Sequence, residues 1–141
     1  MQVGGHYMSI SSILLVEDHA DFAKALAHIL EGKEYLNVAA IATNAEMALE
    51  HLSRQKVDLV LVDVSLPNMN GINLIPLLRQ KYPALLCAML SGHLSPEFAQ
   101  RALDAGAQGY LLKDDVDGII EGIQQILKGE IYVSKEVRAL E

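Results

Sequence analysis

Four charged residues are the candidates for chemistry in this chain, because they stand at the ends of three separate apolar runs. They are Glu17 and Asp18 after one run, Asp63 after a second, and Lys113 after a third. Clustered carboxylate oxygens suit a hard cation such as Mg²⁺, and an ammonium group beside them suits phosphoryl oxygens. The residue types therefore predict an acidic pocket for magnesium and a phosphoryl group, if the fold brings the four side chains together.

The elements that would position these residues alternate regularly along the chain. Apolar runs with strand character alternate five times with segments of helical periodicity, which predicts a parallel sheet with helices on both faces. The expected strands cover about 12–17, 36–42, 57–63, 84–91 and 109–113. The carboxyl ends of parallel strands meet at one edge of the sheet, so we expect one crevice there that contains all four charged residues.

Helix starts are predicted from capping patterns. Thr43 and Glu46 have the spacing of a capping box before the second helix. Ser95 followed by Pro96 predicts the start of the fourth helix, and Asp114 precedes the fifth. These positions fix where each helix should begin.

Composition indicates one α/β domain and excludes several functions. The chain has 141 residues, enough for one domain, and 18 Asp and Glu against 11 Lys and Arg give a net charge of −7. That charge repels a phosphate backbone, so we expect no nucleic-acid binding by this fragment. Without a secretory signal or an apolar run of about 18 residues, the expected location is the cytoplasm, with no membrane contact. We expect a leader at 1–9, a domain at 10–130 and the start of a linker at 131–141.

Other polar residues are interpreted more simply. Cys87 lies within an apolar run and is expected to be a buried, unreactive thiol. His6, His28 and His51 lack the spacing of metal ligands and are expected to be surface or leader residues. Taken alone, Glu17 and Asp18 could also be a solvated helix start.

Four motifs, in order and each at a predicted strand end, resemble the receiver domains of two-component response regulators. They are Glu17-Asp18, the segment 63–71 (DVSLPNMNG), Ser91-Gly92 and the segment 106–113 (GAQGYLLK). The resemblance covers nearly all of 10–134 and is nearest to the LuxR-type branch. It implies a flavodoxin-like, doubly wound (βα)5 fold with strand order 2-1-3-4-5.

The resemblance also implies roles for the motif residues. Asp63 matches the phosphoacceptor, which takes a phosphoryl group from a sensor histidine kinase. Magnesium would be held by Glu17, Asp18, Asp63 and the backbone carbonyl of Ser65, and Lys113 would pair with the phosphoryl oxygens. The protein would then be a signalling switch, not a metabolic enzyme, although it assists its own phosphorylation and dephosphorylation.

Further implications concern the output of the switch and the lifetime of the phosphorylated state. Ser91 would bond the bound phosphoryl group, and Tyr110 would then occupy the space that Ser91 leaves. Ser65 and His93 would tune the lifetime of the acyl phosphate; the dephosphorylation rate of His93→Ala tests the hypothesis for His93. Homodimerisation on activation is expected, as is DNA binding through a C-terminal helix-turn-helix domain, with transcription as the output.

The chain departs from the family pattern at two positions. Glu17 stands where Asp is commoner, a change that the family tolerates. Asp114 follows Lys113 where many relatives have proline, so the cis peptide often found there is in doubt.

Three alternatives remain open from the sequence. An aspartate-based phosphatase would need a second Asp at the position of Ser65 to act as acid and base. A flavodoxin-like electron carrier would need a loop that binds a flavin phosphate, but the acidic residues from Glu17 to Asp21 would repel it. A phosphorylation-independent interaction module is the third alternative, and the presence of Asp63 and Lys113 speaks against it.

Overall fold

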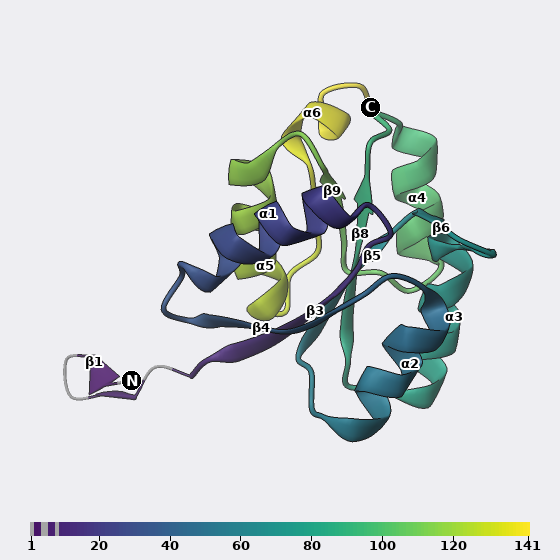
Figure 1. Ribbon diagram of the computed structural model, residues 1–141. Coiled ribbons are helices and arrows are strands. Elements are labelled where there is room, and N and C mark those ends of the chain that lie inside the picture. The colour runs from purple at the N-terminus through teal and green to yellow at the C-terminus, as the bar shows by residue number, and fades with distance from the viewer. Residues whose placement is uncertain (1, 4–5, 8) are drawn as a thin grey trace.

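A central sheet of parallel strands with helices on both faces confirms the predicted α/β architecture (Figure 1). The computed structural model describes residues 2–3, 6–7 and 9–141. Its sheet strands are β3 (Ser11–Val16), β4 (Leu36–Ala42), β5 (Leu59–Asp63), β8 (Leu86–Ser91), β9 (Gly109–Leu112) and β10 (Tyr132–Val133). Their order is β10-β9-β8-β5-β3-β4. The predicted 2-1-3-4-5 order is thus present, with β10 added outside the fifth strand.

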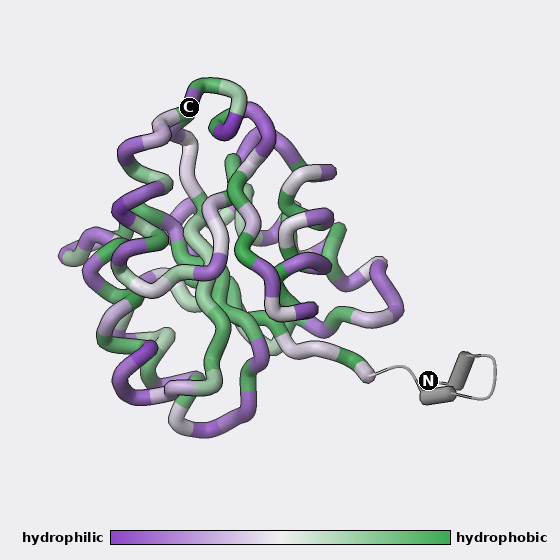
Figure 2. The backbone as a smooth tube through the Cα atoms, turned by 180° about the vertical axis from the view of Figure 1, so that it is seen from behind, coloured by the Kyte–Doolittle hydropathy of each residue, from purple (hydrophilic) through white to green (hydrophobic). Residues whose placement is uncertain are grey.

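The helices form two layers. They are α1 (Ala20–Glu31), α2 (Ala45–Arg54), α3 (Gly71–Lys81), α4 (Pro96–Asp104), α5 (Val116–Leu127) and the short α6 (Lys135–Arg138). Residues of α1 and α5 share one apolar core with one face of the sheet, and residues of α2, α3 and α4 share the other core with the opposite face. Figure 2 shows hydrophobic strands in the interior and more hydrophilic stretches on the helices around them. The sheet is therefore buried on both faces, as parallel sheets are.

Two predicted caps are wrong by one residue. The second helix is capped by Asn44, whose side chain accepts a hydrogen bond from the Met47 N–H at 2.8 Å, and not by Thr43. The fifth is capped by Asp115 and not by Asp114. At each of these helix starts two neighbouring residues could serve as the N-cap, and the path of the loop from the preceding strand decides which of them does. The Ser95 cap is confirmed, with its Oγ 3.2 Å from the Phe98 nitrogen.

A small hairpin connects the end of β5 to the start of α3. It consists of β6 (Ser65–Leu66) and β7 (Met69–Asn70), and Asn68 at its turn has a φ of 63°, a left-handed conformation that asparagine tolerates. The hairpin returns the chain so that Gly71, the first residue of α3, lies against Asp63. A Cβ added to Gly71 would lie 2.1 Å from the Asp63 carbonyl oxygen. Glycine is therefore required for this close approach.

The two ends of the chain differ. In the expected leader, residues 1, 4, 5 and 8 lie outside the described residues, and β1 (Gln2–Val3) pairs antiparallel with β2 (His6–Tyr7). The segment 131–141, expected to begin a linker, contains β10 and α6, and Val137 of α6 is fully buried. Folded structure therefore continues beyond residue 130, the predicted end of the domain.

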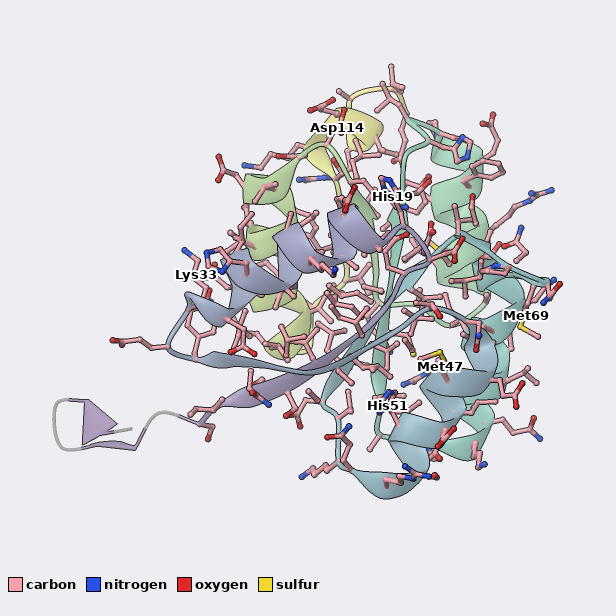
Figure 3. All side chains as sticks on the ribbon, viewed as in Figure 1. His19, Lys33, Met47, His51, Met69 and Asp114 are labelled. Carbon is pink, nitrogen blue, oxygen red and sulfur yellow. The ribbon has the colours of Figure 1, made fainter. Side chains whose placement is uncertain are left out.

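Three minor predictions can be compared with the structure. Cys87 is buried, as predicted, and burial raises the pKa of its thiol to about 12, so the reactive thiolate is suppressed. His28 is exposed on α1 and His51, labelled on α2 in Figure 3, is half-buried, whereas the side chain of His6 lies outside the described residues. Among the helices of residues 2–3, 6–7 and 9–141, none has the length and apolar character needed to span a bilayer.

Candidate functional site

Three charged side chains meet at the carboxyl ends of β3, β5 and β9. Asp63 is the last residue of β5, and Glu17 and Lys113 directly follow β3 and β9. The Lys113 Nζ lies 2.7 Å from Glu17 Oε1 and 3.1 Å from Asp63 Oδ1. Glu17 is 1% exposed and Asp63 is 3% exposed. The structure therefore brings together residues that are up to 96 positions apart in sequence (113 − 17) in one nearly buried cluster.

Neighbouring backbone groups hold these side chains in place. The His19 N–H donates to Glu17 Oε2 at 2.9 Å, and the Ser65 N–H donates to Asp63 Oδ1 at 3.1 Å. Both bonds fix a carboxylate through the loop that directly follows its strand. Charge-assisted bonds of this kind are stronger than bonds between neutral groups.

Lys113 is positioned from both sides. Its backbone N–H donates to the Ser91 carbonyl at 2.9 Å, which continues the pairing between β8 and β9. Its Nζ lies 5.3 Å from the centre of the Phe22 ring of α1, a cation–π distance. Phe22 was not among the predicted site residues, and the sequence signal for it is an aromatic residue in the first turn of the helix that follows an acidic strand end.

The charges in this cluster influence one another. Burial raises the pKa of the Glu17 carboxyl, and the nearby Asp63 raises it further against the opposing bonds from Lys113 and the His19 N–H. Burial alone would lower the pKa of Lys113, but its bonds to Glu17 and Asp63 outweigh this and raise it. Two carboxylates thus share one ammonium, and the cluster has an excess negative charge that a further cation would neutralise.

Glu17→Gln is expected to stabilise the protein at pH 7. The folded-state pKa of Glu17 lies above its unfolded value, so its favourable contribution is complete below about pH 4.5 and is lost as the pH rises through the folded-state pKa. A neutral glutamine avoids this loss, so Glu17→Gln should melt at a higher temperature than the unmodified chain at pH 7. Thermal unfolding at pH 7 and pH 4.5 measures the effect, which should vanish at the lower pH. Glu34→Gln, at an exposed position, is the control; a less stable Glu17→Gln at pH 7 would contradict the expectation.

The donor set suits magnesium in its chemistry. Glu17 and Asp63 each direct a carboxylate oxygen at the Lys113 ammonium, and carboxylate oxygens are ligands that magnesium prefers. Asp18 is exposed, and within the described part of the chain no group of three or more acids, histidines or cysteines is arranged to hold a metal. The role of Asp18 and the full ligand set therefore stay predictions.

Ser91, Tyr110 and the His93 backbone form a closed chain of hydrogen bonds beside the cluster. The Tyr110 hydroxyl lies 2.7 Å from the His93 carbonyl oxygen and 2.9 Å from Ser91 Oγ, and the His93 N–H donates to Ser91 Oγ at 2.9 Å. A phenol has one proton and a carbonyl can only accept, so Tyr110 donates to His93 and accepts from the Ser91 hydroxyl. Burial raises the pKa of Tyr110, which keeps that proton in place at neutral pH. The Ser91 proton is therefore engaged by Tyr110 in this state.

Ser65 and His93, the two residues predicted to tune the lifetime of the acyl phosphate, are both exposed. The side chain of Ser65 is exposed, and the exposed His93 ring packs edge-on against Phe98 with ring centres 4.8 Å apart. Their influence on the acyl phosphate stays a prediction.

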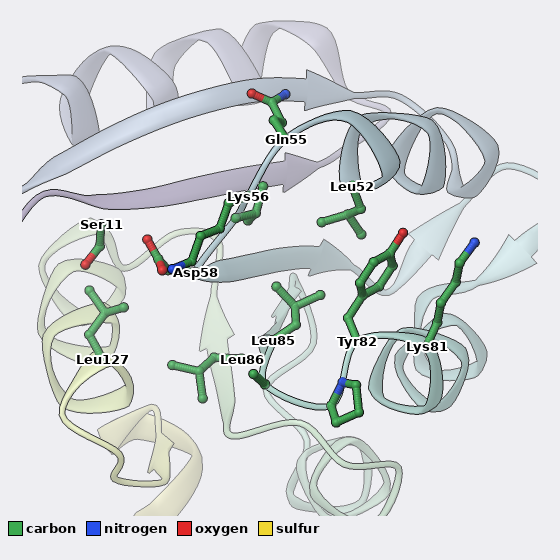
Figure 4. Close-up of a pocket in the computed structure, with 13 residues that line it drawn as sticks. Ser11, Leu52, Gln55, Lys56, Asp58, Lys81, Tyr82, Leu85, Leu86 and Leu127 are labelled. Carbon is green, nitrogen blue, oxygen red and sulfur yellow. The ribbon is translucent and has the colours of Figure 1, made fainter.

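A separate cavity of about 560 Å³ lies at the opposite, amino-terminal end of the sheet (Figure 4). Leu52, Leu85 and Leu127 contribute apolar walls, and Asp58 is bound there by the Ser12 N–H at 2.8 Å. This acid is already engaged in holding the start of β5 to β3. Among the described residues that line the cavity, Asp58 is the sole acid, so the paired carboxylates of the Glu17, Asp63 and Lys113 cluster have no counterpart there.

Comparison with known families gives one clear match. Residues 13–124 match the family model described as the response regulator receiver domain. Because this is most of the chain and includes every residue of the cluster, the match covers the fold and the site together.

Individual relatives agree. The chain is 31% identical over 126 residues to the transcriptional regulatory protein DegU of Brevibacillus brevis, covering 89% of this chain and 53% of that one. It is 35% identical over 127 residues to the transcriptional regulatory protein MctR of Rhizobium johnstonii, covering 89% and 59%. The chain thus spans little more than half the length of these curated relatives.

Solved structures show the same fold. A LuxR-family two-component response regulator from Aurantimonas is 29% identical with a TM-score of 0.88, and the match covers 93% of this chain and 94% of that one. A LuxR-family DNA-binding response regulator from Silicibacter pomeroyi is 30% identical with a TM-score of 0.78, covering 89% and 98%.

Proposed function

This chain belongs to the family of response regulator receiver domains, and on that basis we propose that Asp63 receives a phosphoryl group from a sensor histidine kinase. The observation that carries the proposal is the cluster itself: Asp63 ends β5, nearly buried, and the Lys113 ammonium lies 3.1 Å from its carboxylate and 2.7 Å from that of Glu17. Together with a bound cation, such a site could neutralise the charge of an incoming phosphoryl group. The phosphatase alternative lacks the second acid at Ser65, so a switch is favoured over a metabolic enzyme.

The reaction is a nucleophilic displacement at phosphorus. A carboxylate oxygen of Asp63 forms the new P–O bond while the P–N bond of the kinase phosphohistidine breaks, and the released imidazole keeps the electron pair and takes up a proton. With a small donor such as acetyl phosphate, a P–O bond breaks and acetate leaves. Lys113 then pairs with a phosphoryl oxygen instead of with Asp63 alone.

Magnesium would supply charge neutralisation between the acids and the phosphoryl group. Glu17, Asp63, Asp18 and the carbonyl of Ser65 are the residues that would hold it. Two carboxylates sharing one lysine support this assignment, because the cluster has an unbalanced negative charge. Before binding, Glu17 needs to be ionised, which its raised pKa opposes and a nearby dication would favour.

Output would begin at Ser91. Once a phosphoryl group is present on Asp63, the Ser91 hydroxyl would donate to it and release Tyr110, which keeps its bond to the His93 carbonyl. Shifting such a two-state equilibrium from 1:99 to 99:1 requires about 5.5 kcal/mol. Several charge-assisted bonds in a largely buried site can provide much of it.

The wider context follows from the relatives. DegU and MctR are transcriptional regulators, and the Silicibacter protein is a DNA-binding response regulator. We therefore propose that this receiver regulates transcription through a helix-turn-helix domain attached after it, with homodimerisation on activation. The net charge of −7 agrees with DNA binding through another part of the protein.

Intact mass after incubation with acetyl phosphate and Mg²⁺ tests the proposal. One phosphoryl adduct is expected, and it should be absent from Asp63→Asn and from a chelated sample. Asp114→Asn, a neutralised acid at an exposed position beside Lys113, is the matched control and should still form the adduct. Failure to form an adduct at any donor concentration would favour a phosphorylation-independent interaction module.

A further inference from the structure

Residues close to the end of the chain pack against the domain beside Tyr110. We call residues 131–139 the tail segment; it contains β10 and α6. The Tyr132 N–H donates to the Gln108 carbonyl and the Ser134 N–H donates to the Tyr110 carbonyl, both at 2.9 Å. The backbone of the switch tyrosine is thus bound directly by the tail segment.

Side chains of the tail segment enter the main core. Val137 is fully buried in the apolar cluster that also contains Tyr110 and, from α4, Ala99 and Ala102. The short helix α6 lies against α4 (Figure 1). Val137 therefore sits where a shift of α4 or of Tyr110 changes its packing.

Two glycines lie where β9, α5 and the tail segment meet. A Cβ on Gly122 of α5 would meet Leu111 of β9 first and would lie 2.9 Å from the ring of Tyr132, and a Cβ on Gly109 of β9 would meet Ile126 of α5 first and would lie 3.1 Å from the Tyr132 carbonyl oxygen. Glycine weakens both helices and strands, so its use at both positions points to a close fit of β9, α5 and the tail segment against one another. Within the tail segment, Arg138 holds α6 to β10, with its Nε 2.8 Å from the Val133 carbonyl oxygen and its guanidinium 5.6 Å from the Tyr132 ring centre.

We propose that the tail segment is the output lever of this receiver, and that phosphorylation of Asp63 loosens its seat between β9 and α4. The proposal rests on the function proposed above. When Ser91 turns toward the phosphoryl group, the hydrogen-bonded chain of Ser91, Tyr110 and His93 opens. The loop that carries Ser91 and His93 leads straight into α4, so one wall of the Val137 seat moves while the other, Tyr110, loses a bond.

This arrangement has a reciprocal consequence. If the phosphorylated state holds the tail segment more weakly, then releasing the tail segment must favour that state by the same factor. Typical couplings of this kind correspond to about 5- to 150-fold. A signal could therefore pass in either direction between Asp63 and any chain attached beyond the tail segment.

Hydrogen exchange with and without beryllofluoride and Mg²⁺, a non-covalent phosphoryl mimic, tests the forward direction. Exchange of the Ser134 and Val137 amides should become at least about fivefold faster with the mimic. The Ala48 amide, bonded to the Asn44 carbonyl at the start of α2, is the internal control and should not change. Unchanged or slower exchange in the tail segment, with the mimic bound, would overturn the proposal.

The reverse direction is tested by Val137→Asp, which should expel α6 and tighten beryllofluoride binding by the factor seen in exchange. Glu136→Ala, at an exposed position on the same helix, should bind like the unmodified chain. Val137→Ala provides a milder version if the aspartate variant does not fold. Equal affinities for all variants would contradict the coupling.

The two proposals fail separately. If the chain forms the Asp63 adduct but the tail segment stays equally protected from exchange, the proposed function is supported and only the coupling of the tail segment to Asp63 is contradicted. A chain that forms no adduct and binds no beryllofluoride would lose both.

Discussion

Replacing Lys113 with alanine is expected to lower the stability at pH 7 by about 3 kcal/mol and to slow phosphoryl transfer to Asp63 by at least about a hundredfold. The stability loss arises because Glu17 and Asp63, both nearly buried, lose the cation that they share at 2.7 and 3.1 Å. The rate loss arises because the phosphoryl oxygens lose their charged partner. Denaturant unfolding and the rate of adduct formation measure the two effects.

The pH dependence of the stability loss in Lys113→Ala identifies the cause of that loss. In the unmodified chain the pKa of Lys113 is raised above its ordinary value, so the lysine stays charged between pH 5 and 8 and its contribution there is constant. In Lys113→Ala, the pKa of Glu17 should rise further. The Glu17 carboxyl can then bind a proton and so avoid the cost of a buried, unpaired charge. The deficit of Lys113→Ala should therefore be largest at pH 7 to 8 and should shrink toward pH 5. Lys113→Arg keeps the charge and should recover much of the stability; a deficit that does not vary with pH would contradict this account.

Gly71→Ala is expected to destabilise the protein by about 3 kcal/mol and to impair phosphorylation, although the substitution adds a single methyl group. The new Cβ would lie 2.1 Å from the carbonyl oxygen of Asp63 and 3.0 Å from a methyl of Val62. Because the neighbour is the backbone of β5, relief requires α3 to move away from the sheet or Asp63 to move from its place beside Lys113. Thermal unfolding and the rate of adduct formation are the measurements.

A second glycine provides the matched control. Gly92 follows Ser91 at the same edge of the sheet, and a Cβ there would meet no heavy atom within 4 Å. Gly92→Ala should therefore change the stability by less than about 0.5 kcal/mol. If both variants behaved alike, the close approach of Gly71 to Asp63 would not be what restricts that position.

The sequence predicted the sheet and the cluster because both depend on strong, repeated signals. Alternating apolar runs predicted five parallel strands, the family resemblance implied their order, and the strand ends predicted that Glu17, Asp63 and Lys113 lie together. The cap errors at Asn44 and Asp115 occurred where two cap-forming residues are adjacent, and there only the path of the connecting loop decides.

Other features depend on contacts that no local pattern contains. The bonds from Ser91 to Tyr110 and from Tyr110 to the His93 carbonyl need the packed geometry of two neighbouring strands and a loop. The docking of Val137 likewise depends on its neighbours in space, and four helical residues are too few for a periodic signal. The linker was predicted at 131–141 because the helical periodicity of the fifth helix ends before it. The folded structure continues beyond the point where that periodicity stops.

The strand β10 also bears on how this domain avoids self-association. Edge strands with free N–H and C=O groups attract strands from other molecules. At one edge of this sheet, Glu31 engages the Val38 N–H of β4 at 2.9 Å, and at the other edge β10 occupies the carbonyls of Gln108 and Tyr110. A chain cut at residue 130 would leave β9 uncovered, with the groove for Tyr132 empty, and light scattering should then detect concentration-dependent aggregation. By covering β9, the strand β10 is thus expected to oppose self-association of the domain.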